Sequence, residues 1–291
     1  MNYFQILVTN DITEHKECKG INNKIHNEVM VMIQKVGLAQ MDIVFGDPEE
    51  NKVRVEQWVK KAKEEGCGIV VLPELWTTGY DLTRINEIAD EGAEDSSSFL
   101  TSLSKKYSIH IIGGSVANKS TDGVRNTLLV ADAYGVLVKR YSKLHLFKLM
   151  NEHHYLLPGE EDGAFSLDDT MMAGLICYDI RFPEWFRKHV MMGAKIVFVV
   201  AEWPAARMDH WETLLRARAI ENQCFVIACN RVGSDPDNEF GGSSLIIDPW
   251  GEILAKGTKS EQLVAAEIDL QEVEKVRKQI PIFQDRRPNF Y

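Results

Sequence analysis

Residues 171–204 read MMAGLICYDIRFPEWFRKHVMMGAKIVFVVAEWP, and the pattern changes twice along this stretch. Residues 171–179 begin with a continuous apolar run that predicts a strand. Residues 181–194 start near a proline and have helical spacing, so they predict a helix. Residues 195–204 are again apolar and predict a second strand. A strand, a helix and a strand in this order are typical of an α/β fold.

The same alternation extends outward on both sides, from Val31 towards the C-terminus. Residues 46–66 predict a helix in which Asp47 caps the first turn and Gly66 ends the last. Two further segments, 126–143 and 243–255, predict β-hairpins because a turn signal separates two apolar runs. This gives more strands than a simple alternating βα chain. We therefore expect an α/β fold with two mixed sheets packed face to face and helices outside.

Residues 1–29 differ from the rest because they are polar and aperiodic. We interpret them as an N-terminal extension, either disordered or preceding a native start at Met30 or Met32. A regulatory arm is the alternative interpretation. Residues 30–291 are expected to form a single domain, since no linker or low-complexity tract interrupts them.

Composition excludes several classes of function. The chain has 291 residues and a net charge of −10, which disfavours binding to nucleic acid or anionic lipid. No apolar run reaches the length of a membrane span. The five cysteines form no CxxC pair, so we expect a reducing, cytoplasmic location. There is no glycine-rich nucleotide motif.

Three polar residues stand where predicted strands end. Glu74 ends the apolar run GIVVLPE, Lys143 follows the strand of the first hairpin, and Cys177 follows the run MMAGLI. Sites in α/β folds gather at such strand ends. A thiol needs a base or a positive field to react, and a carboxylate with an ammonium can supply both. Taken singly, each residue fits a surface or packing role, but together they predict a catalytic site.

The segments VLPELWTTGYD, YSKLHLF, PGEEDG and GLICYDIRFPEWFR, in this order, resemble the signature segments of the nitrilase superfamily of carbon–nitrogen hydrolases. The resemblance implies a four-layer α-β-β-α sandwich. It implies that Glu74 is the general base, Lys143 stabilises the oxyanion and Cys177 is the nucleophile. It also implies a positioning role for Glu152. The backbone N–H of Tyr178 would complete the oxyanion hole, and no metal or organic cofactor is needed.

Within the superfamily, HLFKLMNEHHYLLPG, AEWP and DHWETLLRARAIENQCFV resemble bacterial ω-amidases. This implies a small amide substrate that carries a carboxylate, such as 2-oxoglutaramate, and a homodimer. Arg181 is the first candidate to bind that carboxylate, although an ion pair with Glu184 is an equal alternative. Trp203, Trp76 and Tyr80 are candidate pocket walls.

Three alternatives remain open at this stage. A nitrilase or an N-carbamoyl amide hydrolase would use the same three residues. A metal hydrolase would use the histidine-rich stretch 145–154, although HExxH is absent. A non-enzymatic scaffold would keep the fold for binding only.

Overall fold

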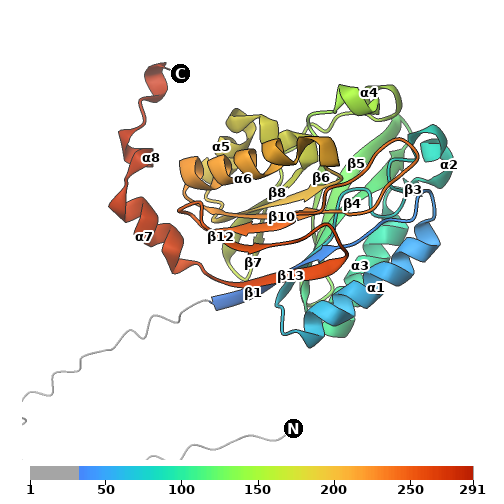
Figure 1. Ribbon diagram of the computed structural model, residues 1–291, viewed down its shortest axis with the longest axis horizontal. Helices are drawn as coiled ribbons and strands as arrows, with labels where there is room; N and C mark the ends of the chain where they lie inside the picture. Colours follow the sequence, from blue (N-terminus) through green and yellow to red (C-terminus); the bar gives the residue numbers. More distant parts are fainter. Residues whose placement is uncertain (1–32, 291) are drawn as a thin grey trace, which may run out of the picture. The chain divides into compact units, whose positions relative to one another are not determined.

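Two mixed β-sheets lie at the centre of the computed structural model, which describes residues 33–290 (Figure 1). The predicted extension over residues 1–29, together with Met30, Met32 and Cys18, lies outside the described residues. Helices cover the outer face of each sheet, α1 and α3 on one side and α5 and α6 on the other (Figure 1). The predicted four-layer α-β-β-α arrangement is confirmed.

The first sheet has the strand order β13-β1-β2-β4-β5-β6, with β3 paired to β4. Strands β1, β2 and β4 run parallel, while β13, β5 and β6 are antiparallel to their neighbours. The predicted hairpin over 126–143 is confirmed as β5 and β6. The strands are β1 (Ile33–Gln40), β2 (Ile69–Val71), β3 (Asp90–Glu91), β4 (His110–Ser120), β5 (Gly123–Ala131), β6 (Leu137–Ser142) and β13 (Gln262–Asp269).

The second sheet has the order β12-β11-β10-β9-β8-β7. Strands β8, β9 and β10 are parallel, and β11 with β12 forms the second predicted hairpin. These strands are β7 (Ala164–Leu167), β8 (Thr170–Ile176), β9 (Ile196–Ala201), β10 (Phe225–Asn230), β11 (Leu245–Ile247) and β12 (Ile253–Lys256).

The two sheets approach closely where β5 faces β8. A Cβ added to Gly174 would lie 2.9 Å from the Leu128 side chain, so a side chain at this position would push the sheets apart. Leu128 is fully buried in this part of the core. This close packing sets the distance between loops that leave different sheets.

The outer helices bury one apolar stripe each. Helix α1 (Pro48–Glu64) begins as predicted, with Asp47 accepting a hydrogen bond from the Glu50 backbone N–H, and buries Val55, Val59 and Ala62. The other helices are α2 (Ile85–Ile88), α3 (Glu94–Tyr107), α4 (Glu152–Tyr155), α5 (Pro183–Met191), α6 (Met208–Asn222), α7 (Gln271–Gln279) and α8 (Ile282–Asp285). Within residues 33–290, none of the helices has the length and apolarity needed to cross a bilayer.

Candidate active site

The chain makes a sharp turn at Cys177, between β8 and a short 3-10 helix (Cys177–Arg181). Cys177 has a φ of +44°, in the left-handed region that a residue with a Cβ seldom adopts. Tyr178 follows at the start of this helix, where backbone N–H groups have no partner within the helix. The turn therefore places a thiol next to a free backbone donor.

Asp179 holds this turn in place from inside the protein. Its carboxylate accepts hydrogen bonds from the Ile176 backbone N–H (3.1 Å) and from the Tyr141 hydroxyl (2.7 Å). The backbone N–H of His145 donates to its other oxygen at 3.1 Å. Left-handed strain at a residue such as Cys177 costs about 1–3 kcal/mol, and these buried bonds offset it.

Glu74 follows β2 and is completely buried. Its Oε1 accepts hydrogen bonds from Lys143 Nζ and Asn126 Nδ2, both at 2.8 Å, and from the Tyr80 hydroxyl at 3.1 Å. Its Oε2 accepts a hydrogen bond from the backbone N–H of Glu202 at 2.8 Å. Donors from both sheets therefore fix the position of this carboxylate.

Lys143 lies between two buried carboxylates. Its Nζ is 2.8 Å from Glu74 Oε1 and 2.6 Å from Glu152 Oε1, and all three side chains are inaccessible to solvent. Burial opposes the positive charge, but the negative charges of Glu152 and Glu74 prevail and raise the pKa of Lys143 well above its ordinary value. Lys143 is therefore a permanent cation in this centre.

Cys177 lies beside this charged cluster and is 3% exposed. Burial, and then the negative charge of Glu74, raise the pKa of the Cys177 thiol well above its ordinary value, although Lys143 acts in the opposite direction. The resting sulfur is therefore protonated, with the Glu74 carboxylate near enough to act on it electrostatically.

Glu152 has a second role in the same cluster. Its Oε2 accepts a hydrogen bond from the Phe147 backbone N–H at 2.7 Å, and its Oε1 accepts one from the Tyr80 hydroxyl at 2.6 Å. Burial raises the pKa of Glu152, although the Lys143 ammonium opposes this shift. Glu152 thus connects the loop after residue 143 to the lysine.

A narrow cleft with a volume of about 10 Å³ opens onto Cys177. The lining residues are Phe147, Cys177, Tyr178, Arg181, Trp203, Pro204 and Arg207. The guanidinium of Arg181 lies 4.9 Å from the ring centre of Trp203. Its Nη2 is 3.2 Å from His210 Nδ1, and among residues 33–290 no carboxylate, Glu184 included, forms an ion pair with it. The alternative ion pair with Glu184 is therefore wrong.

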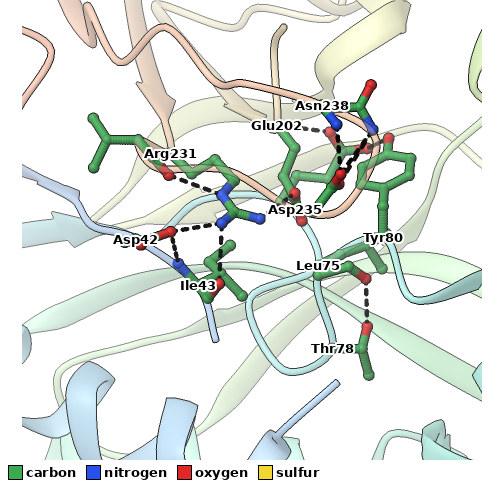
Figure 2. A network of polar contacts seen from close by, with 12 residues as sticks. Asp42, Ile43, Leu75, Thr78, Tyr80, Glu202, Arg231, Asp235 and Asn238 are labelled. Atoms are coloured by element: carbon green, nitrogen blue, oxygen red, sulfur yellow. Dashed lines mark hydrogen bonds and ion pairs between the residues drawn. The ribbon is translucent and has the colours of Figure 1, made fainter. Parts of the chain in front are cut away.

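Behind the Glu74 carboxylate lies a second buried ion pair. Glu202 Oε2 is 2.8 Å from Arg231 Nη1, and both side chains are fully buried. Figure 2 shows the Arg231 guanidinium directed at Asp42 and Ile43, to which it donates hydrogen bonds of 2.6 and 3.0 Å. Burial raises the pKa of Glu202 to about 8, although Arg231 opposes this shift.

A comparison with protein families matches residues 35–278 of this chain to carbon-nitrogen hydrolases. The chain belongs to the carbon-nitrogen hydrolase family. It is 54% identical over 256 residues to a 2-oxoglutaramate amidase of Bacillus subtilis, covering 88% of this chain and 98% of that protein. It is 35% identical to the ω-amidase YafV of Yersinia enterocolitica, covering 86% and 96% of the two chains.

Solved structures agree with this assignment. XC1258 of Xanthomonas campestris, a protein of the same superfamily, is 30% identical and covers 88% of this chain and 97% of its own, with a TM-score of 0.82. This carbon-nitrogen hydrolase is thus an enzyme that acts on non-peptide amide bonds.

The structure corrects one of the predicted substrate-binding residues, Trp76. Trp76 is fully buried against Phe99 on the outer side of the first sheet, where its Nε1 donates to the Gly113 carbonyl, so it does not line the cleft. Leu75, between Glu74 and Trp76, has a φ of +42°. Such a turn breaks the alternation of side-chain directions that an extended strand would give to Glu74 and Trp76. Tyr80 contacts the buried carboxylates and is not among the residues that line the cleft.

The histidine-rich stretch is engaged elsewhere. The His145 ring lies 2.8 Å from Asp179, and Glu152 is bonded to Lys143, so neither is available to a metal ion. Sequence analysis missed Asn126, which touches Glu74. The signal that could have identified it is a buried-type position occupied by asparagine close to the apolar run LLVA of the same strand.

Proposed function

We propose that this hydrolase is an ω-amidase, which converts 2-oxoglutaramate into 2-oxoglutarate and ammonia through a thioester on Cys177. The observation that carries the proposal is the convergence of Glu74, Lys143 and Glu152 beside the Cys177 thiol. The substrate follows from the relative that is named a 2-oxoglutaramate amidase and from the cationic cleft.

In the first half-reaction, Glu74 takes the proton of the Cys177 thiol as the sulfur attacks the amide carbon. The C–N π-conjugation is lost and a tetrahedral oxyanion forms. The Lys143 ammonium and the Tyr178 backbone N–H stabilise this negative charge. Glu74 then gives its proton to the nitrogen, the C–N bond breaks, and ammonia leaves a thioester.

In the second half-reaction, Glu74 removes a proton from water and the hydroxyl oxygen attacks the thioester carbon. The same two donors hold the second oxyanion. Its collapse breaks the C–S bond, and the sulfur recovers its proton from Glu74 while the acid leaves. Glu152 takes no proton in this sequence and keeps the Lys143 ammonium in place.

At the other end of the substrate, Arg181 binds the carboxylate. Its guanidinium lines the cleft and lies over the ring of Trp203. A guanidinium binds a carboxylate through two parallel hydrogen bonds. Trp203 forms the wall on the same side.

We also propose a homodimer in a reducing, cytoplasmic compartment. The described cysteines Cys67, Cys177, Cys224 and Cys229 are all free. Apolar side chains that a second copy can cover are exposed at the end of α5 and on α6, namely Met191, the following Met192, and Ile220. Light scattering of the purified protein tests the dimer, and a mass of one chain contradicts it.

The direct test is mass spectrometry of the protein quenched during turnover of 2-oxoglutaramate. The expected result is ammonia release with an acyl adduct on the peptide that contains Cys177. The Cys177→Ala variant should give neither, while keeping the unfolding midpoint of the parent protein. Turnover without any adduct on this peptide contradicts the thioester.

A substrate panel decides between the remaining functions. Turnover of a nitrile or an N-carbamoyl amide, with none of 2-oxoglutaramate, favours the alternative hydrolases. No turnover of any amide, together with unchanged binding of a ligand by Cys177→Ala, favours the scaffold.

A further inference from the structure

The rim of the Cys177 cleft carries a second guanidinium, from Arg207. Arg207 ends the short 3-10 helix Ala205–Arg207 that follows β9, and its side chain is partly buried. Its guanidinium carbon lies 5.3 Å from the ring centre of Phe147, another residue of the cleft.

Five rim residues form a closed ring of contacts. Arg207 lies over Phe147, and the Phe147 ring centre is 4.7 Å from that of Tyr178. Arg181 lies 5.9 Å from the Tyr178 ring and 4.9 Å from the Trp203 ring. The Trp203 Nε1 closes the ring by donating to the Arg207 carbonyl at 2.8 Å. The two cations therefore face one opening from separate positions on its rim.

In the part of the chain that the structure describes, no carboxylate forms an ion pair with either guanidinium. The Arg181 guanidinium instead lies 3.2 Å from Nδ1 of the His210 ring. Each guanidinium lies over the face of an aromatic ring, at a cation–π distance. Two like charges around one small opening repel each other, and a bound anion removes that cost.

We propose that Arg207 is a second substrate-binding residue, which together with Arg181 binds the 2-oxo acid end of the substrate. This inference rests on the proposed function. A 2-oxo acid presents three neighbouring oxygens, two from the carboxylate and one from the ketone. One guanidinium fork satisfies the carboxylate, and the second donates to the ketone oxygen and the near carboxylate oxygen.

The second cation also weakens the binding of glutamine. Glutamine carries the same terminal amide and the same carboxylate, but an ammonium replaces the 2-oxo group. Arg207 repels this ammonium and has no acceptor there, so binding loses an attraction and gains a repulsion. The reaction class that supplies the substrate is then one that converts an amino group to a ketone.

The test compares Arg207→Met with the parent protein on three amides: 2-oxoglutaramate, glutaramate, which lacks the ketone, and neutral butyramide. We expect kcat/KM for 2-oxoglutaramate to fall at least tenfold. The loss for glutaramate should be smaller, and that for butyramide below threefold, because only the first substrate uses the second fork. In Arg207→Met, the ratio of the turnover rate of 2-oxoglutaramate to that of glutamine should decrease.

Two further variants complete the design. Arg207→Lys keeps the charge without the fork, so it should retain part of the preference for 2-oxoglutaramate over glutaramate. Arg54→Met makes the same exchange on helix α1, at an arginine paired with Glu261, and should leave all three rates unchanged. Equal unfolding midpoints exclude misfolding as the cause of a loss.

Two results overturn the inference. If Arg207→Met lowers all three rates by the same factor, or changes none of them, Arg207 does not recognise the 2-oxo acid. If the parent protein turns over butyramide but no carboxylated amide, the proposed function fails as well. Hydrolysis of 2-oxoglutaramate by the parent protein with an unchanged variant ratio refutes the role of Arg207 alone.

Discussion

Tyr80→Phe removes one hydroxyl from between two buried carboxylates. The Tyr80 hydroxyl lies 2.6 Å from Glu152 Oε1 and 3.1 Å from Glu74 Oε1. The exchange leaves the ring in place and adds no charge. Both oxygens keep the Lys143 ammonium as a donor, so neither acceptor becomes unpaired.

The size of the effect follows from the single proton of this hydroxyl. It makes one strong bond at a time, and a hydrogen bond to a charged group contributes about 1.5–3 kcal/mol. Because the acceptors keep Lys143, we expect a loss near 2 kcal/mol. In a protein of this size, that lowers the unfolding midpoint by about 4–8 °C. If the same bond orients the carboxylates during turnover, kcat/KM falls about thirtyfold.

The assay combines thermal unfolding with a pH profile of 2-oxoglutaramate hydrolysis. The Tyr80 hydroxyl lowers the pKa of Glu152, so its removal raises that pKa and moves the acid limb of kcat/KM to higher pH. Tyr107→Phe is the matched control, because its hydroxyl also bonds a carboxylate, Glu56 at 3.3 Å, but outside the candidate active site. An unchanged midpoint together with an unchanged pH profile would refute the reasoning.

Three further predictions concern neighbouring positions. Asn126→Ala removes a donor to Glu74, and steady-state kinetics should show kcat/KM about tenfold lower with a smaller change in KM. Because burial raises the pKa of Glu202 to about 8, its protonated form stabilises the fold at low pH, and this contribution fades between about pH 4.5 and 8. The unfolding midpoint should therefore fall more steeply with rising pH, across that range, for the parent protein than for Glu202→Gln. Trp76→Phe deletes the bond to Gly113 and buried volume, so calorimetry should show a destabilisation of about 1–3 kcal/mol while substrate preference stays the same.

The fold could be predicted from local patterns because helices and strands each give the sequence a characteristic periodicity. The cap at Asp47, the two hairpin turns and the continuous apolar strands are each readable within about fifteen residues. Helix α7 was missed because only Val273 and Val276 of its nine residues are buried, which is too weak a stripe to detect.

For the candidate active site, the part that could be predicted from the sequence is different. Glu74, Lys143, Glu152 and Cys177 were named from strand ends and family resemblance, and the structure brings them together, while their chemical roles stay predictions. Neighbours in the chain were misleading, since Trp76 turns away from the site two residues after Glu74.

The sequence by itself determined the layered architecture and the family and named the candidate catalytic residues, since each leaves a local or ordered signal in the chain. Only the tertiary structure decided which groups surround those residues. The Glu202 backbone N–H reaches Glu74 from 128 positions away, and Arg207 reaches the rim beside Phe147. Such contacts depend on how two sheets pack and how their loops turn, and no pattern within one segment encodes that geometry.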